Sequence, residues 1–298
     1  MNFAEWRSQP YVSNATPIVI GGCGRSGTTL LRVMLDSHPN ISCGPESELF
    51  LVGVGGGIPP AELARRFDFP QDRISELKEQ CSSLAEFTDR FLAEYAGATG
   101  KRRWAEKTPK NVAVLDYIFA HFPKAQFVHV IRDGRDVVCS LRRHPQYKLV
   151  NGQMTKCHTD NPIRICIERW VRDVRAGLAY RDDPRYCEVR YEDLVSDTEQ
   201  TLRRLLAFLG EPWDEKVMAF HTVKSASRDV EKFPHNPEAT QPLSSSSIGR
   251  WRVGLTRTEA AFFKALAGTL LCQLGYAADD RWEPDGTYQS LPAVPAAS

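Results

Sequence analysis

The sequence lacks the residue spacings by which proteins usually bind a metal ion. Its eight cysteines contain no C-x-x-C pair, and its seven histidines show no H-E-x-x-H or comparable spacing. Scattered cysteines predict reduced thiols, with an extracellular disulfide framework as the alternative that composition leaves open. We therefore expect no metal site in this chain.

Long apolar runs and an excess of one charge are also missing. No apolar run approaches the ~20 residues needed to span a bilayer, and the N-terminal residues show no signal-peptide core. The 38 basic and 37 acidic side chains give a formal net charge of +1, which offers no broad field for nucleic acid. We expect a soluble, non-secreted, cytoplasmic protein without a nucleic-acid partner, in which any anion site is local.

What the chain does have is enough apolar content for one large domain. With 298 residues and 42% hydrophobic side chains, it can bury a substantial core, and we favour one domain over two small ones. Strand and helix patterns alternate, which predicts an α/β fold with a mostly parallel central sheet flanked by helices. We place the domain at residues 1–282 and expect 283–298 to be a disordered tail.

The expected elements follow from apolar periodicity and from the residues that begin and end helices. Helices are predicted at 28–37, 163–180 and 259–274, and a polar helical region at 61–96 is expected to cap the sheet. Asp197 is a candidate N-cap for a helix that Gly210 ends. Strands are predicted at 17–22, at 125–131 and in "RYCEVRYEDLV", with loops at 52–60 and in "QPLSSSSIGRW".

The stretch "PIVIGGCGRSGTTLL" has the layout of a phosphate-binding loop. Gly22, Gly27 and Thr29 fit G-x-x-x-x-G-K-[ST], but Thr28 stands where the lysine should be and Arg25 precedes it. Backbone N–H groups in this turn and the following helix N-terminus should bind an oxyanion. The alternative is an ordinary turn between a strand and a helix.

A second apolar strand, "FVHVI", ends in a cation instead of an acid. Nucleoside triphosphatases place an acidic Mg²⁺ ligand there, whereas this chain has Arg132. An arginine facing the site would bind another phosphate, so the sequence suggests a nucleotide with two separate phosphate groups, held without metal. Asp133 or Asp136 as a metal ligand remains the alternative.

Four ordered motifs resemble those of the sulfotransferases that use 3′-phosphoadenosine 5′-phosphosulfate (PAPS). "GRSGTTLL" is similar to their 5′-phosphosulfate loop, and "VIRDGRDVVCS" is similar to their 3′-phosphate motif. "RYEDL" and a late "GRW" also recur in that family, and the resemblance runs from Ile18 to Tyr276. "SCGPESE" most resembles the tyrosylprotein sulfotransferase-like branch. The resemblance implies a single P-loop-like domain and a metal-independent sulfotransferase.

The resemblance also implies roles for particular residues. Those assigned to the 5′-phosphosulfate are Arg25, Ser26, Gly27, Thr28 and Thr29; Arg132 and Ser140 are assigned to the 3′-phosphate, and Tyr191 and Ser247 to the remaining donor contacts. Arg25 is counted among the catalytic residues too. Lys107 would neutralise the leaving oxygen, and Glu46 would be the general base because Lys107-Thr108-Pro109 lacks the histidine of the cytosolic aryl and steroid enzymes.

Each of these roles has a structural alternative. For Glu46 it is a cap for backbone N–H groups, for Lys107 a solvated loop charge and for Arg25 one half of a surface ion pair. For Tyr191 it is a core aromatic residue, and for Trp251 we favour packing over stacking on a base. The sequence departs from the resemblance at one disulfide. In the tyrosylprotein enzymes the cysteine that corresponds to Cys43 forms a disulfide bond, and at the position of its partner cysteine this chain has Ala105.

The implied reaction is in-line transfer of a sulfuryl group to an acceptor hydroxyl or amine. The alternatives are a metal-dependent P-loop kinase and a non-catalytic nucleotide-binding protein. Three segments are expected to line the acceptor site, at 52–60, 61–96 and 142–162. The acceptor is a peptide tyrosine, a glycan, a lipid or a small molecule, and a homodimer is compatible with the resemblance.

Overall fold

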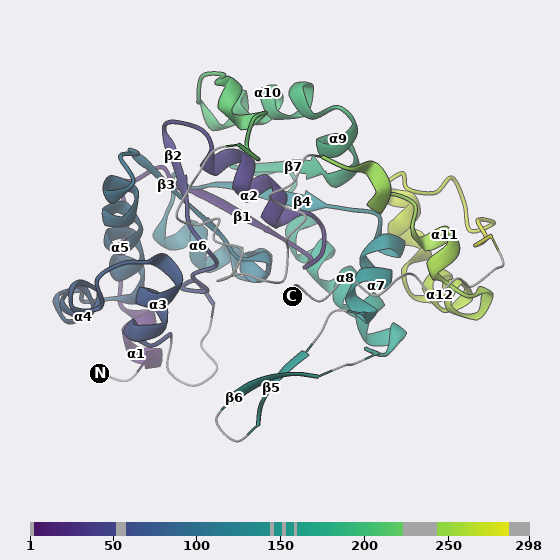
Figure 1. Ribbon diagram of the computed structural model, residues 1–298, viewed down its shortest axis with the longest axis horizontal. Coiled ribbons are helices and arrows are strands. Elements are labelled where there is room, and N and C mark those ends of the chain that lie inside the picture. The colour runs from purple at the N-terminus through teal and green to yellow at the C-terminus, as the bar shows by residue number, and fades with distance from the viewer. Residues whose placement is uncertain are drawn as a thin grey trace.

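A five-stranded parallel sheet forms the centre of the molecule (Figure 1). The computed structural model describes residues 3–51, 58–143, 146–150, 153–157, 160–222 and 243–285. The strands are β1 (Ile18–Gly22), β2 (Ile41–Cys43), β3 (Arg103–Lys107), β4 (Gln126–Ile131) and β7 (Tyr186–Arg190), in the order β2-β3-β1-β4-β7. Every pairing in this sheet is parallel, which confirms the predicted fold class.

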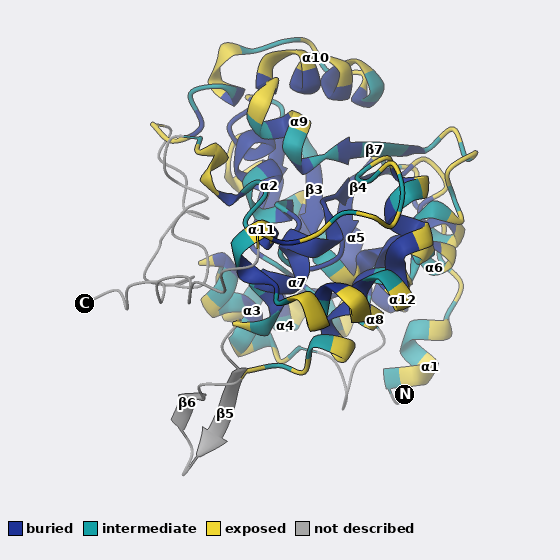
Figure 2. Cartoon of the chain, turned by 90° about the vertical axis from the view of Figure 1, so that its right-hand side faces the viewer, coloured by how far each residue is buried: buried dark blue, intermediate teal, exposed yellow. Residues whose placement is uncertain are grey.

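The sheet is apolar on both faces, as a buried parallel sheet must be. Successive residues of a strand point to opposite faces, so Ile18 and Ile20 join one core cluster while Val19 joins another. On the face of Ile18 and Ile20, helices α2 (Thr28–Asp36), α9 (Tyr191–Ser196) and α10 (Thr198–Leu209) supply apolar side chains. Figure 2 shows the strands buried between the two helical layers.

Helices on the opposite face complete the core. They are α5 (Leu84–Ala98), α6 (Leu115–His121), α7 (Gly134–Arg142), α8 (Ile163–Leu178) and α12 (Arg257–Gln273), together with the 3₁₀ turn η1 (Pro109–Ala113). Smaller helices lie at the periphery: α1 (Phe3–Ser8), α3 (Pro60–Phe67), α4 (Gln71–Gln80) and α11 (Trp251–Gly254). The 3₁₀ turns η2 (Glu215–Val217) and η5 (Ser245–Ser247) complete the described elements.

A two-stranded antiparallel hairpin projects from the body of the molecule below the sheet in Figure 1. It consists of β5 (Gln146–Val150) and β6 (Gln153–Cys157) and falls within the segment 142–162 that was expected to line the acceptor site. The other expected acceptor loop, 52–60, lies mostly outside the described residues, because 52–57 are not described.

Several element boundaries differ from the sequence prediction. The region 61–96 is three helices, and the predicted strand "RYCEVRYEDLV" ends at Arg190 because Tyr191 begins α9. The last helix begins at Arg257, two residues before the predicted start, because Thr256 and Glu259 form a reciprocal capping box. Asp197 occupies the predicted N-cap position, but its side chain accepts no cap hydrogen bond within the described residues.

Two residues beyond residue 282 contact the helices of the domain. Lys264 on α12 forms an ion pair with Glu283 at 2.6 Å, and the Asp285 N–H donates to the Arg252 carbonyl at 2.8 Å. The rest of the predicted tail, 286–298, lies outside the described residues. Within the portion of the chain that is described, no helix has the length and apolarity needed to cross a bilayer.

Candidate active site

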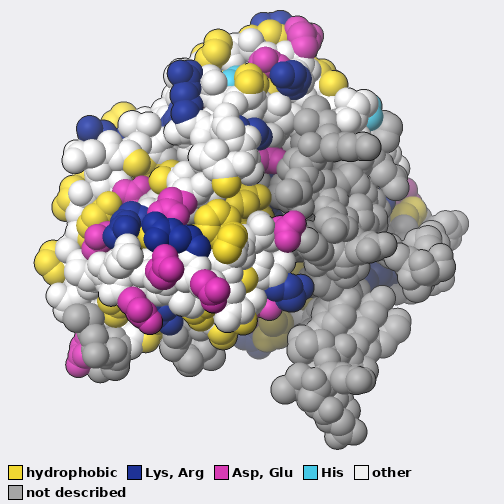
Figure 3. All heavy atoms as spheres, turned by 60° about the vertical axis from the view of Figure 1, so that its left-hand side comes forward, with side chains coloured by type: hydrophobic (Ala, Val, Ile, Leu, Met, Phe, Trp, Pro, Cys, Tyr) yellow, Lys and Arg dark blue, Asp and Glu magenta, His cyan; other side chains and the backbone are white. Residues whose placement is uncertain are grey.

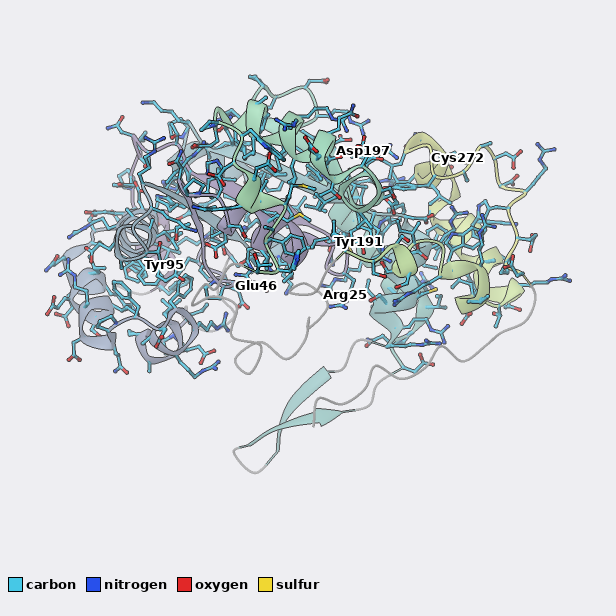
Figure 4. The ribbon with its side chains drawn as sticks, turned by 45° about the horizontal axis from the view of Figure 1, so that its top comes forward. Arg25, Glu46, Tyr95, Tyr191, Asp197 and Cys272 are labelled. Atoms are coloured by element: carbon cyan, nitrogen blue, oxygen red, sulfur yellow. The ribbon has the colours of Figure 1, made fainter. Side chains whose placement is uncertain are left out.

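The predicted site residues gather at the carboxyl ends of β1, β3, β4 and β7. The turn after β1 supplies residues 23–27, β3 ends at Lys107, and Arg132 and Tyr191 directly follow β4 and β7. Figure 4 labels Glu46, Arg25 and Tyr191 in the central part of the view. The carboxyl ends of the strands are where ligands bind in open parallel sheets.

Backbone conformation explains the glycines of the turn after β1. Gly27 is the N-cap of α2 with φ 94°, a left-handed conformation, and a Cβ added there would collide with the Tyr191 ring. Arg25 also has a positive φ, 73°, which is uncommon for a residue with a side chain. The turn therefore holds an unfavourable backbone conformation, a feature often found at binding sites.

Ser26 is an unsatisfied polar group in this turn. Its side chain is buried, and its hydroxyl finds no hydrogen-bond partner among the described residues. Buried hydroxyl groups are normally paired, so this one is available to a ligand. The N-terminus of α2 supplies backbone N–H groups beside it, and the two features together suit an oxyanion.

Arg132 connects three parts of the site. Its guanidinium donates to the Arg25 carbonyl at 3.1 Å, donates to the Ser247 carbonyl and lies 4.4 Å from the centre of the Tyr191 ring. Its Nε atom is buried and has no partner within the described part of the chain. Ser140 accepts from Arg25 Nε at 3.0 Å, so both predicted 3′-phosphate residues are tied to Arg25.

Ser247 is held in place by two side chains. Its hydroxyl lies 2.5 Å from the Tyr191 hydroxyl, and the carboxylate of Asp136 accepts from the Gly249 and Trp251 backbone N–H groups at 2.8 and 2.9 Å. Burial raises the pKa of Asp136 to about 6. The structure therefore links α7 to the segment that presents Ser247.

Lys107 and Glu46 form a direct ion pair at the other end of the site. The Lys107 ammonium contacts Glu46 Oε1 and also donates to Thr29 Oγ1 at 3.2 Å. The Lys107 side chain is only 3% exposed, whereas that of Glu46 is 40% exposed. Thr29 lies in the first turn of α2, so this pair is connected directly to the candidate anion loop.

The charge of Glu46 is stabilised by three cations. Burial disfavours its ionised form, but the Lys107 ammonium and the Arg32 and Arg66 guanidinium groups outweigh that effect, so the pKa of Glu46 lies below its usual range. Arg66 also donates to the Glu46 carbonyl at 3.0 Å, and Arg32 donates to the Cys43 and Gly44 carbonyls at 3.3 Å. Glu46 is thus ionised and held by its neighbours at neutral pH.

Three residues of this region were not singled out from the sequence: Arg32, Glu106 and Asp136 in its role as an anchor. Each is a charged side chain that is buried in the folded protein, and no local pattern in its helix or strand marks it in the sequence. Trp251, by contrast, packs between Arg135, at 3.9 Å from its ring centre, and Trp282, at 5.2 Å. Its surroundings are those of a packing residue.

On the face of the molecule shown in Figure 3, basic side chains are bordered by acidic ones, in keeping with the net charge of +1. No cluster of three or more His, Cys, Asp or Glu residues suited to a metal ion occurs among the residues that were described. The available groups, namely a glycine turn, a buried hydroxyl and two arginines, suit a ligand with two anionic groups.

Comparison with known proteins places these residues in a wider context. A sequence profile described as "Sulfotransferase family" matches residues 17–215. Protein-tyrosine sulfotransferase 1 of Danio rerio is 27% identical over 279 residues, which cover 90% of this chain and 75% of the relative.

Two solved structures are similar in fold. The sulfotransferase domain of the Synechococcus PCC 7002 olefin synthase has a TM-score of 0.60 at 23% identity, covering 83% of this chain and 90% of that one. A mouse sulfotransferase in complex with PAP has a TM-score of 0.56 at 14% identity, covering 92% and 93% of the two chains. At these identities the likeness is one of architecture.

Proposed function

The chain belongs to the sulfotransferase family, and from this premise we propose that it transfers a sulfuryl group from PAPS to an acceptor hydroxyl. The observation that carries the proposal is that the Lys107 ammonium donates to both Thr29 and Glu46. These two hydrogen bonds connect the candidate anion loop, a buried cation and an ionised carboxylate. A structural neighbour that is a complex with PAP supports this class of donor.

The donor is proposed to bind through its two anionic ends. The turn at residues 24–29, with the buried hydroxyl of Ser26, would hold the 5′-phosphosulfate, and Arg132 with Ser140 would hold the 3′-phosphate. Gly27 allows Tyr191 to pack directly against the turn, where Tyr191 and Ser247 would contact the rest of the donor. Arginine suits such contacts because its planar fork matches phosphate oxygens.

Catalysis is proposed to depend on positioning and electrostatics. Lys107 is buried, so its charge acts in a region of low dielectric and can stabilise the negative charge that develops on the leaving oxygen. Glu46 is ionised and partly exposed, and it can take the proton of an acceptor that approaches from its exposed side. By analogy with phosphoryl transfer, the attacking and leaving oxygens lie in line.

A peptide tyrosine is the first acceptor to test, because the curated relative is named a protein-tyrosine sulfotransferase. Glycans, lipids and small hydroxylated molecules are the other acceptor classes. Metal independence, a cytoplasmic location and a homodimer stay predictions, each of which solution experiments can address.

The experiment is a transfer assay with ³⁵S-labelled PAPS and a panel of tyrosine peptides, glycans, lipids and small phenols. We expect label to appear in an acceptor with and without a chelator such as EDTA. Activity that requires added Mg²⁺ and consumes ATP would favour a kinase. Tight binding of PAPS with no transfer to any acceptor class, and no change of phenotype on loss of Glu46 or Lys107, would favour a nucleotide sensor.

A further inference from the structure

Glu106 is a fully buried carboxylate directly before Lys107 in the sequence. It is 1% exposed, on strand β3, in a protein interior where an unpaired charge is costly. Its Oε1 atom accepts from the Ser47 N–H at 3.1 Å, the Ser47 hydroxyl at 2.9 Å and the Thr108 hydroxyl at 2.7 Å. Its Oε2 atom accepts from the Asn111 amide.

These partners are the sequence neighbours of the two proposed catalytic residues. Ser47 follows Glu46, and Thr108 follows Lys107. The Thr108 hydroxyl also accepts from the Glu48 N–H at 3.2 Å, so the loop of Glu46 and the end of β3 are fastened together at two points. Glu48 has a positive φ of 56°, an unfavourable conformation that this fastening helps to maintain.

We propose that Glu106 is a positioning residue that fixes the Glu46 loop to the Lys107 strand and so sets the geometry of the catalytic pair. Glu106 and Lys107 are successive strand residues, so their side chains leave β3 on opposite sides, and Glu106 acts through backbone and hydroxyl groups without contacting the reacting atoms. The proposal rests on the proposed function, because it assumes that Glu46 and Lys107 do the chemistry.

The hydrogen bonds show that the acceptor atom matters more than the charge. Three of the four donors converge on Oε1, which glutamine also provides. The glutamine amide would replace Oε2 and meet the Asn111 amide, but Asn111 Oδ1 has no partner within the described residues, so a flip of Asn111 would supply an acceptor. The flip would give up the 3.2 Å bond from Asn111 to the Ile20 carbonyl and bring Asn111 Oδ1 next to that carbonyl oxygen, a cost that falls on stability.

The test compares Glu106→Gln with Glu106→Leu. We expect Glu106→Gln to keep kcat within about threefold, and Glu106→Leu to lower kcat by about 10- to 100-fold, as a misplacement near 1 Å does. The Kd for adenosine 3′,5′-bisphosphate, measured by titration calorimetry, should change by less than about threefold in both. A loss of kcat as large in Gln as in Leu would overturn the proposal, because it would assign the effect to the charge.

Thr108→Val serves if Glu106→Leu does not fold. It removes the 2.7 Å donor to Glu106 and the acceptor for the Glu48 N–H while keeping the side-chain shape. We expect a three- to tenfold loss of kcat at unchanged bisphosphate affinity, of the size expected for a smaller displacement. Unchanged kcat in a folded Thr108→Val protein would contradict the proposal.

Asp89 provides a matched control for the loss of a buried carboxylate. It is 9% exposed, and within the described residues it accepts from neutral donors, namely the Tyr11 hydroxyl at 2.8 Å, the Trp104 indole at 3.0 Å and the Ser13 hydroxyl. Asp89→Leu should lower the melting temperature and leave kcat at 20 °C within about twofold. An equal fall of kcat in Asp89→Leu and Glu106→Leu would mean that Glu106 serves stability alone.

Combining Glu106→Leu with Glu46→Gln distinguishes a failure of this proposal from a failure of the proposed function. In Glu46→Gln protein the base is already absent, so adding Glu106→Leu should cost less than about threefold further in kcat, since residues that act as a unit are not additive. A full additional loss in that background would overturn the proposal. If Glu46→Gln by itself has no effect on kcat, the base assignment fails instead, and the two failures are told apart.

Discussion

At the scale of single residues, the Glu46–Lys107 contact determines how the proposed base is tested. A carboxylate that only stabilised the loop would affect stability and donor binding, whereas a base affects turnover. We predict that Glu46→Gln lowers kcat by about 10²- to 10⁴-fold while the Kd for bisphosphate stays nearly unchanged. Stopped assays with labelled donor and calorimetric titration give both values. Normal turnover in this variant would exclude Glu46 as the base.

Lys107 should behave differently from the residues of the anion loop. Its ammonium is buried and shared between Thr29 and Glu46, and charge on the leaving oxygen develops mainly in the transition state. We predict that Lys107→Ala lowers kcat by at least about 100-fold and weakens donor binding by less than tenfold. Arg25→Ala is the comparison, because it should weaken the donor and the bisphosphate alike. A Lys107→Ala variant that lost affinity but kept its rate would contradict the assignment.

Arg132 has two possible roles, which its hydrogen bonds define. Its guanidinium already donates to two carbonyl groups, Arg25 and Ser247, so it could be a binding residue or a support for the fold. A charge-assisted hydrogen bond is worth roughly 1.5–3 kcal/mol, so Arg132→Ala should weaken adenosine 3′,5′-bisphosphate by about 10- to 100-fold. Adenosine 5′-monophosphate should be affected by less than about threefold.

The test measures the Kd of adenosine 3′,5′-bisphosphate and of adenosine 5′-monophosphate for wild type and for Arg132→Ala, and compares the loss of affinity for the two nucleotides. Equal losses for the two nucleotides would mean that Arg132 acts by holding Arg25 and Ser247 in place. Ser140→Ala is a useful companion, because Ser140 contacts Arg25 Nε at 3.0 Å and leaves the carbonyl contacts of Arg132 intact.

At the scale of elements, the turn between β1 and α2 is the part of the site with the least freedom. Gly27 has φ 94°, and a methyl group at its Cα would overlap the Tyr191 ring. We predict that Gly27→Ala weakens bisphosphate binding by at least about tenfold, because both the backbone conformation and the packing of α9 on the turn must change. Gly210→Ala is the control, since Gly210 also has a positive φ, 71°, but a Cβ there meets no atom within 4 Å. Equal binding losses in the two variants would contradict a role specific to the turn.

The same comparison of elements shows what the sequence could predict. β1 with α2 and β4 with α7 were predicted because the strand, the turn and the helix are continuous in sequence and carry their own signals. β2 and β3 were not, because β2 has only three residues and both depend on parallel pairing with strands far away along the chain. Short strands of this kind are defined by their partners.

The residues of the candidate site likewise fall into two groups, those that a local motif predicts and those that only the folded chain reveals. Arg25, Ser26, Gly27 and Arg132 stand in local motifs, and the structure brings them together. Glu106 contacts Ser47 across 59 residues, and Asp136 contacts Trp251 across 115, so no local pattern could reveal either anchor. Long-range hydrogen bonds between buried groups are a property of the folded chain.

At the scale of the whole molecule, the protonation of His129 makes the free energy of unfolding depend on pH. It lies on β4, between β1 and β7 in the sheet, and is fully buried, with Nδ1 2.6 Å from the Tyr186 hydroxyl, and its Nε2 atom has no partner in the described part of the chain. Burial lowers its pKa from 6.5 to about 4. Between those two pH values the unfolded chain binds a proton that the native protein does not, so the stability that this histidine provides is lost as the pH falls.

The size and sign of this effect are measurable by urea unfolding of wild type and His129→Asn at pH 7.0 and 4.5. Asparagine cannot titrate and can still form a hydrogen bond with the Tyr186 hydroxyl, so we expect the variant to be less stable than wild type at pH 7. The difference in unfolding free energy should narrow by about 2 kcal/mol at pH 4.5. Asp136, with its pKa raised to about 6 by burial, acts in the opposite direction, since the stability that its protonated form provides is lost as the pH rises. Asp136 is present in both proteins, so its effect cancels when the unfolding free energies of wild type and His129→Asn are compared at the same pH. His121→Asn, at the partly exposed end of α6, controls for the loss of an imidazole, and a gap between wild type and His129→Asn that stayed constant with pH would show that the buried ring of His129 does not govern acid stability.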